Sequence, residues 1–390
     1  MSDERLQALA EHVRRADDDR VPLLLAGGGT KAFLHEPAAP AQSASGNVGA
    51  AAVRTLDLRG YAGIVDYEPT ELVVTARCGT PLAALEAALA ERGQMLGFEP
   101  PHFGAQATVG GCVAAGLSGP RRATAGSLRD FVLGARVIDA RGRVLAFGGQ
   151  VMKNVAGYDV SRLMAGSMGI LGAIVEVSLK VLPRPIAETT LRFELSQADA
   201  VLRFNQWAGQ PLPISATAWS DGAAWVRLSG APPAIDAALR SLGGEQVAAA
   251  QADAWWAGLR NQSAAFFEPA SQGRASLWRL SVPAIAAPLA LPPALAGQGA
   301  ASLVEWGGAL RWLSVDAGLP AEADAALRIR AAAEAAGGTA SLFRRAPAHG
   351  AWAPLRTHPL APAVAGIHQR LKREFDPNGI FNPHHLVPGL

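Results

Sequence analysis

The chain has 390 residues, 49% of them hydrophobic, which is enough for two folded domains. Its 35 basic and 33 acidic residues leave a net charge of only +2, so the charge gives no indication of binding to nucleic acid or anionic lipid. The only cysteines, Cys78 and Cys112, are too few for a four-thiolate iron–sulfur cluster or zinc site, and we expect no metal. They also form no disulfide framework, so a reducing, cytoplasmic location is expected.

Two stretches bear on export and on membranes. The first 20 residues are rich in charge and lack an apolar centre, which argues against a secretory signal. The apolar stretch 282–296 contains four prolines, and a membrane-spanning helix of about 20 residues does not accommodate them. We therefore expect no transmembrane segment, and any membrane association to be peripheral, at the inner face and through partners.

In the first half of the chain, short apolar runs alternate with turn residues. Thr80, followed by Pro81, is expected to cap a helix with Leu82, Leu85 and Leu89 on one face. The runs predicted to be strands, with the fifth and sixth joined as a hairpin, are 21–26, 55–58, 63–67, 72–77, 131–139, 144–147 and 172–182.

The composition changes after Pro183 and Pro185, since all nine tryptophans lie at or beyond Trp207. The pattern there is strand, helix and hairpin, followed by a looser copy. The predicted segments are 190–195, 198–207, two strands around 221–222, 303–306, 309–314, 321–336 and 339–345. A last helix, 363–374, leads into a turn that returns Ile380 and Phe381 to an apolar surface of the first domain.

These patterns predict an α+β protein. We place a first domain at 1–185, an α+β cap domain with antiparallel sheet at 186–362, and a C-terminal segment packing back on the first domain at 363–390.

A glycine-rich loop, 27–31, follows a buried strand. Its backbone can bring several N–H groups against a phosphate, because glycine leaves no Cβ in the way; a plain structural turn is the alternative. Gly27, Gly29 and Ala32 also match a Rossmann dinucleotide fingerprint. That fingerprint must open a helix, whereas Pro37 and Pro40 follow at once, so we reject it.

A second glycine cluster, 108–122, consists mostly of small residues and has a potential N-cap at Thr108. It can bring a short helix start against an anion or let a planar ligand lie on the backbone. Tight helix–sheet packing is the alternative. The presence of two such loops in one domain favours pyrophosphate binding over a purely structural role for either loop.

Several longer motifs of the chain resemble those of one known superfamily of proteins. The two glycine loops and the segments 126–134, 166–172 and 375–383 occur in the order seen in flavoproteins of the vanillyl-alcohol-oxidase (PCMH-type) superfamily. Within that superfamily, 117–122, 151–159 and 306–312 resemble the FAD-binding subunit of bacterial glycolate oxidase. The resemblance covers nearly the whole chain and implies a two-subdomain FAD-binding domain with a cap.

The resemblance also implies which residues contact FAD. They are Gly27, Gly28, Gly29, Thr30 and Lys31 in the first loop, Thr108, Gly110, Gly111, Ala115, Gly116 and Ser118 in the second, and Gly126, Asp130 and Ile174 beyond. The histidine that tethers flavin in some relatives has no match in 27–34, so non-covalent FAD is expected. Cys112 is interpreted as a buried thiol rather than a flavin link. The family's terminal glycine and basic residue are replaced by His384 and His385, which we interpret as solvated tail residues.

The sequence identifies no catalytic base, because the eight histidines include no His-x-His pair like that of catalytically complete relatives. Arg279 and Arg311, on predicted cap strands, are candidates for the substrate carboxylate, with an ion pair as the alternative. Arg121, Arg122 and Lys153 adjoin the proposed flavin loops and are further candidates for balancing flavin or phosphate charge. The cap tryptophans 255, 256, 306 and 312 are expected in the core, with a partner interface as the alternative.

The resemblance implies an FAD-dependent oxidoreductase subunit that takes part in oxidising glycolate to glyoxylate, beside a second FAD-containing subunit and an iron–sulfur subunit. Two alternatives remain: a stand-alone FAD dehydrogenase of another 2-hydroxy acid, and a non-catalytic scaffold that binds FAD for stability.

Overall fold

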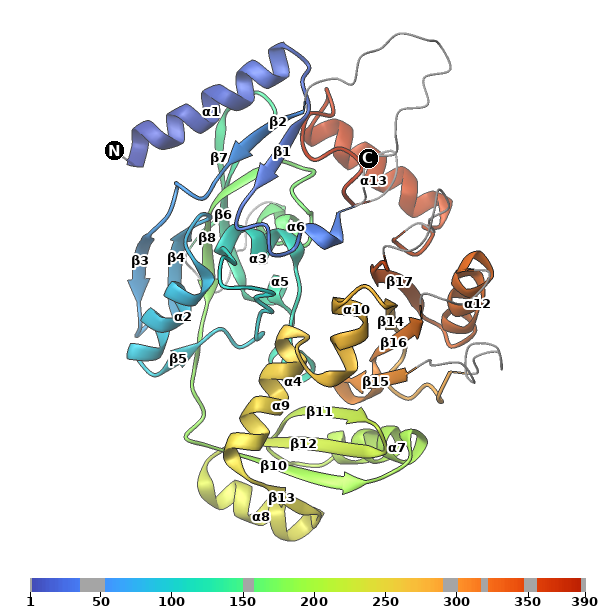
Figure 1. The fold of residues 1–390 in the computed structure, drawn as a ribbon. Helices are drawn as coiled ribbons and strands as arrows, with labels where there is room; N and C mark the ends of the chain where they lie inside the picture. The colour runs from blue at the N-terminus through green and yellow to red at the C-terminus, as the bar shows by residue number, and fades with distance from the viewer. Residues whose placement is uncertain are drawn as a thin grey trace. The chain divides into compact units, whose positions relative to one another are not determined.

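A computed structural model describes residues 2–35, 53–149, 158–289, 301–316, 322–346 and 356–386. The chain divides into two compact units, each made of segments that are distant in sequence (Figure 1). The first unit comprises 1–117, 127–183 and 360–390, and the second comprises 118–126 and 184–359. The helices and antiparallel sheets confirm the predicted α+β class.

The first unit contains a small parallel strand pair and a five-stranded antiparallel sheet. The pair is β1 (Leu23–Ala26) with β2 (Arg54–Asp57), and α1 (Ser2–Asp18) lies beside it (Figure 1). The larger sheet has the order β3-β4-β8-β6-β7. Its strands are β3 (Ile64–Glu68), β4 (Val73–Arg77), β6 (Val132–Ile138), β7 (Val144–Gly148) and β8 (Ala173–Lys180). The predicted hairpin is confirmed as β6 paired with β7.

Short elements complete this unit. They are η1 (Ala32–Leu34), α2 (Leu82–Glu91), β5 (Gln94–Met95), α3 (Val109–Ala115), α5 (Leu128–Phe131), α6 (Val160–Met164), β9 (Leu182–Pro183) and α13 (Pro362–Phe375). The predicted Thr80 cap of α2 is wrong. The helix begins after Pro81 without a side-chain cap, because the Thr80 hydroxyl instead exchanges hydrogen bonds with the N–H and C=O of Gly63.

The C-terminal segment returns to this unit, as predicted. Phe381 forms a parallel bridge with Leu23 of β1, and Ile380 and Phe381 are both fully buried. They share one hydrophobic core with Val13 of α1 and Val175 of β8. Ile380 and Phe381 therefore help to fix the strand from which the first glycine loop departs.

The second unit is an eight-stranded antiparallel sheet with two symmetric halves. Its order, β13-β10-β12-β11-β15-β16-β14-β17, places β10 to β13 in one half and β14 to β17 in the other, each in the same arrangement from the edge inward. The strands are β10 (Ala187–Glu194), β11 (Ile214–Ser220), β12 (Ala223–Gly230), β13 (Glu245–Val247), β14 (Ala275–Ser281), β15 (Ala301–Glu305), β16 (Leu310–Asp316) and β17 (Thr339–Arg344). The two halves correspond to the strand, helix and hairpin pattern and its looser copy that the sequence predicts.

Each half has its own hydrophobic core. Phe204 and Trp207 of α7 (Gln197–Ala208) belong to the first core, and Ile329 of α12 (Glu322–Ala335) to the second. The remaining elements are α4 (Arg122–Ala125), α8 (Pro232–Leu242), α9 (Ala249–Asn261), η2 (Ala265–Phe267), α10 (Glu268–Ser271) and η3 (Trp306–Gly308). Trp256, Trp306 and Trp312 are buried, as expected, whereas Trp255 is partly exposed and stacks on Trp225.

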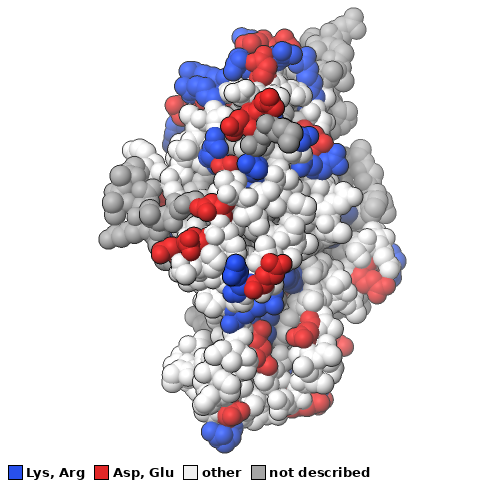
Figure 2. Space-filling model, turned by 90° about the vertical axis from the view of Figure 1, so that its left-hand side faces the viewer, with Lys and Arg blue, Asp and Glu red and all other residues white. Residues whose placement is uncertain are grey.

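Basic and acidic side chains are interspersed on the face shown in Figure 2. This agrees with the nearly balanced charge of the sequence. Within the described residues, no helix is both long enough and apolar enough to span a bilayer.

Candidate functional site

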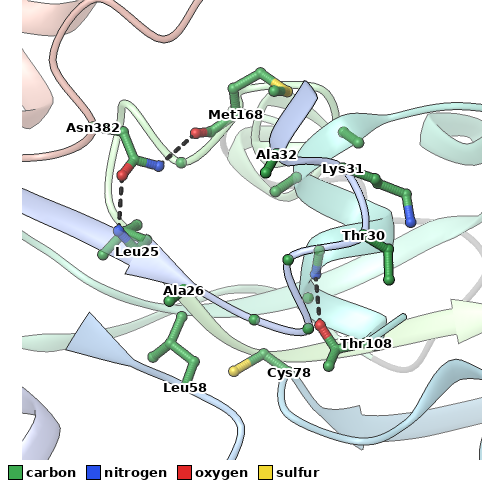
Figure 3. Close-up of a pocket in the computed structure, with 18 of the residues that line it drawn as sticks. Leu25, Ala26, Thr30, Lys31, Ala32, Leu58, Cys78, Thr108, Met168 and Asn382 are labelled. Atoms are coloured by element: carbon green, nitrogen blue, oxygen red, sulfur yellow. Dashed lines mark hydrogen bonds between the residues drawn. The ribbon is translucent and has the colours of Figure 1, made fainter. Parts of the chain in front are cut away.

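A cavity of about 200 Å³ lies within the first unit (Figure 3). It is bordered by the loop after β1, the start of α3, the segment before β8 and the end of the chain. The residues that line it are Leu24, Leu25, Ala26, Gly27, Gly28, Gly29, Thr30, Lys31, Ala32, His35, Leu58, Cys78, Thr108, Gly110, Gly111, Ala114, Ala115, Met168, Gly169, Ile174 and Asn382.

The first glycine loop packs directly on the second. A Cβ on Gly28 would lie 1.6 Å from the Gln106 carbonyl oxygen, and one on Gly27 would lie 2.6 Å from Thr108 Oγ1. Gly29 differs, because its φ is +70° and a Cβ there would meet nothing within 4 Å. Glycine is therefore needed at 27 and 28 for loop packing, and at 29 for a left-handed backbone beside open space.

The loop does not open an α-helix. It leads into η1, a single 3₁₀ turn of three residues. The rejection of a Rossmann fingerprint is therefore confirmed, since that motif requires a helix at this point.

The second loop forms the start of α3. Thr108 caps it, with Oγ1 accepting a hydrogen bond from Gly111 N at 3.3 Å, as predicted (Figure 3). Gly110 lies against Cys78, where an added Cβ would be 2.6 Å from the cysteine Cβ. Burial raises the pKa of the Cys78 thiol to about 12, so the thiol is neutral at physiological pH. This part of the wall is thus small, close-packed and uncharged.

Lys31 is the cation of the cavity wall. The residue is 8% exposed, its ammonium donates to the His102 carbonyl at 3.4 Å, and within the described residues it forms no ion pair. Burial lowers its pKa, because desolvation disfavours the charged form. A bound anion would compensate that cost. Backbone amides of a glycine loop together with a buried ammonium are groups that suit a diphosphate.

The end of the chain holds the cavity together. Asn382 Oδ1 accepts from Leu25 N at 2.8 Å, and its Nδ2 donates to Met168 O at 2.8 Å (Figure 3). Behind it, the Lys372 ammonium contacts Asp376 Oδ2 at 2.6 Å and donates to the carbonyls of Ile170 and Phe381. One asparagine thus joins β1 to the segment before β8.

The interpretation of both terminal histidines as solvated is wrong for His385. His384 is exposed, but the His385 ring stacks on that of His35 with their centroids 4.1 Å apart. His35 lines the cavity, one residue beyond the stretch in which a tethering histidine was sought. The C-terminal segment folds back at this point, so that His35, which is distant in sequence, covers the ring of His385.

The predicted cofactor contacts fall into two groups. Ten line the cavity: Gly27, Gly28, Gly29, Thr30, Lys31, Thr108, Gly110, Gly111, Ala115 and Ile174. Four are not on its wall. Gly116 ends α3 at φ +64°, Ser118 and Gly126 belong to the second unit, and Asp130 accepts hydrogen bonds from Ser127 at the start of α5.

Sequence reasoning missed several residues of the wall, notably Leu58, Cys78, Met168 and Asn382. Met168 and Asn382 lay in motifs that the resemblance already used, 166–172 and 375–383, so the motifs themselves were the available signal. Leu58 and Cys78 are buried core residues, and only the fold brings them to the cavity.

The arginine candidates lie in the second unit, and Lys153 lies outside the described residues. Arg121 pairs with Glu188 at 2.6 Å. Arg311 is buried and donates to the carbonyls of Gly308, Ala286 and Ala287, so its guanidinium serves the local fold. Arg122 and Arg279 both contact the Trp306 ring.

The geometry defines a site of the nucleotide-binding type, built from glycine loops. Similarity to known proteins identifies the class of protein to which it belongs. Residues 4–148 match the FAD binding domain family, and FAD is the cofactor of this fold. The chain is 47% identical over 384 residues to glycolate oxidase subunit GlcE of Escherichia coli, covering 98% of each. It belongs to the GlcE family of glycolate oxidase subunits.

More distant relatives share part of the chain. Glycolate oxidase subunit GlcD of Bacillus subtilis is 32% identical over 35% of this chain and 29% of its own length. D-lactate dehydrogenase of Archaeoglobus fulgidus is 30% identical over 51% of this chain and 42% of its own length. An alkyldihydroxyacetonephosphate synthase structure has a TM-score of 0.65 at 14% identity, covering 96% of this chain and 74% of its own, and supports the fold alone. By their names, the sequence relatives GlcE, GlcD and D-lactate dehydrogenase belong to oxidoreductases that act on hydroxy acids.

Three observations show that the cavity wall suits the diphosphate of FAD. Its two loops have no Cβ at the points of closest approach, its one buried ammonium lacks a carboxylate among the described residues, and the rest of its wall is apolar or small. Among the residues that the structure describes, no group of three or more His, Cys, Asp or Glu is arranged to hold a metal ion.

Proposed function

We propose that this chain is the FAD-carrying subunit of a glycolate-oxidising complex, which works with a second flavoprotein and an iron–sulfur subunit. The observation that carries the proposal is the 47% identity to GlcE over 98% of both chains, together with a cavity that fits the cofactor. Bound flavin supplies the electron acceptor for oxidation of the alcohol carbon of a 2-hydroxy acid.

The protein's own groups bind and orient the cofactor. Backbone N–H groups of 27–31 and the Lys31 ammonium would hold the diphosphate of FAD, and the small residues of 108–115 would allow the rest of the cofactor to lie close to the backbone. Asn382 fixes the distance between β1 and Met168, two parts of the wall. These groups bind the cofactor and move no proton.

FAD is held without a covalent bond in this proposal. His35 is the histidine of the cavity wall, but its ring is stacked on His385. Denaturation by acid or heat should release the flavin into the protein-free filtrate. Flavin that stays with the precipitated polypeptide would refute non-covalent binding, and His35→Ala would then show whether this residue is the tether.

The activity is tested by reconstitution. The chain is co-purified with its partner subunits from the native host, and glycolate-dependent reduction of a dye acceptor is followed while glyoxylate is trapped as its hydrazone. We expect equimolar glyoxylate and reduced dye, and loss of both when this chain is omitted. A complex that keeps full activity without the chain would refute the proposal.

A further inference from the structure

The connection between β15 and β16 has an unusual backbone. Trp306 has φ +56°, followed by Gly307 at +67° and Gly308 at +110°. In the other half of the sheet, the equivalent connection is Asp221 and Gly222, the residue types that adopt this conformation readily. A bulky residue at positive φ is strained, and such strain is concentrated at binding and catalytic sites.

Hydrogen bonds hold the strained residue in place. The Trp306 indole N–H donates to the Gly119 carbonyl at 3.0 Å, and Gly307 N donates to Thr217 Oγ1 at 2.9 Å. Asn205 Nδ2 donates to the Gly307 carbonyl at 3.0 Å. The indole is therefore fixed in one orientation before any ligand arrives.

Two guanidinium groups converge on this indole. Arg122 Cζ lies 4.5 Å, and Arg279 Cζ 5.4 Å, from the centre of the Trp306 ring. Both side chains are partly exposed, and within the described residues neither guanidinium forms a hydrogen bond or an ion pair. The neighbouring Arg121 and Arg227, by contrast, both face the Glu188 carboxylate.

Within the described residues, no salt bridge neutralises the charge of this pair, and Glu305 offsets it only in part. Burial and, to a smaller extent, the positive charge of Arg122 lower the pKa of Arg279 to about 10, while Glu305 acts in the opposite direction. The Glu305 carboxylate accepts a hydrogen bond from Trp312 Nε1 at 2.8 Å. A small anion bound to the two guanidinium groups would relieve this repulsion.

We propose that Arg122 and Arg279, arranged on Trp306, bind the carboxylate of the 2-hydroxy-acid substrate. The inference rests on the proposed function for the identity of the acid. Guanidinium groups bind carboxylates through paired N–H donors, and the indole restricts the positions that the two planes can adopt. All three residues belong to the second unit.

The test is calorimetric titration of the full-length, FAD-loaded chain with glycolate. Arg279→Gln and Arg122→Gln should each weaken binding about tenfold or more, because each removes a charge-assisted hydrogen bond. Arg279→Lys should bind better than Arg279→Gln, because it keeps the charge. Arg240→Gln removes an exposed arginine of α8 with the same change in net charge and should bind like the unaltered chain. Glycolamide, which has no carboxylate, should not bind.

The outcomes are separable. Should the Arg279 variants fail to fold by circular dichroism, Arg122→Gln decides, since that side chain is on the short helix α4 and partly exposed. No glycolate binding to the unaltered chain, equal binding by the Gln variants, or equal binding of glycolamide would overturn the site. Failure of the reconstituted complex to oxidise glycolate would instead overturn the proposed function, and the titration does not depend on turnover.

Discussion

Gly28 lies where the backbones of two loops meet. We predict that Gly28→Val abolishes FAD binding, because a Cβ there would lie 1.6 Å from the Gln106 carbonyl oxygen and would push the loops apart. The reason is loop packing rather than left-handed backbone, since the positive φ belongs to Gly29. The affinity for FAD, measured by quenching of flavin fluorescence, should fall by a factor of at least about 100, which corresponds to about 2.7 kcal/mol.

Gly209→Val is the control for this substitution. Gly209 is exposed at the end of α7, its φ is −83°, and its nearest contact to an added Cβ is 3.6 Å. The variant should keep FAD affinity and thermal stability. Undiminished affinity in Gly28→Val would show that the two loops do not need this close approach.

The His35–His385 stack should make stability depend on pH. Burial, with the nearby charges of His35, His384 and Lys372, lowers the pKa of His385 from 6.5 to about 4. The unfolded chain therefore takes up this proton first as the pH falls, so the stabilisation is complete above about pH 6.5 and is lost progressively towards pH 4. The melting temperature of His385→Phe should consequently fall less over that range than that of the unaltered chain.

Thermal melts at half-unit pH steps measure this difference. His12→Gln, on α1, serves as a control and should retain the slope of the unaltered chain. An identical slope in His385→Phe would mean that other groups cause the acid sensitivity.

At the scale of one element, the i,i+4 pair at the end of α13 stabilises the return of the chain. Asp376 is buried and accepts hydrogen bonds from Lys372, Ile380 N and Phe381 N. We predict that Asp376→Asn destabilises the protein by about 3–5 kcal/mol, because it leaves the buried Lys372 charge without its counterion. It should also weaken FAD binding, since Asn382 follows the same turn. Urea unfolding and FAD titration measure the two effects.

Asp324→Asn is a matched control. Asp324 and Arg328 form an i,i+4 pair on α12 with both side chains 53% exposed. Exposed pairs of this kind contribute at most about 1 kcal/mol, so the variant should unfold at nearly the same urea concentration as the unaltered chain. Equal, small losses in both variants would show that the buried pair contributes no more than a surface pair.

The elements show what local sequence predicts and what it does not. Apolar periodicity correctly predicted the hairpin of β6 and β7, and the N-cap of α3 followed from Thr108, because both signals lie within a few residues. The cap of α2 failed because Thr80 bonds to Gly63, 17 residues away. Asn382 contacts Leu25, 357 residues away in sequence. Contacts between residues so distant in sequence arise from the tertiary fold, and apolar periodicity does not predict them.

At the scale of the whole molecule, the chain has a cofactor site, but the described residues of that site include no group placed to take a proton from an alcohol. The cavity wall contains one histidine, His35, and its ring is stacked on another. Two cysteines in the whole chain exclude a four-thiolate cluster for passing electrons onward. A general base must reach the proton that it removes, and the described residues show no such base on the wall of the FAD cavity.

We therefore predict that the isolated, FAD-loaded chain oxidises glycolate at less than about one hundredth of the rate of the complex per flavin, the range that loss of a general base alone produces. Steady-state dye reduction at saturating glycolate compares the two directly. The chain must first be shown to hold FAD stoichiometrically, so that a low rate does not reflect an empty site. Equal rates per flavin would place the whole reaction in this chain, and the search for its base would then turn to the second unit, where Arg122 and Arg279 converge on Trp306.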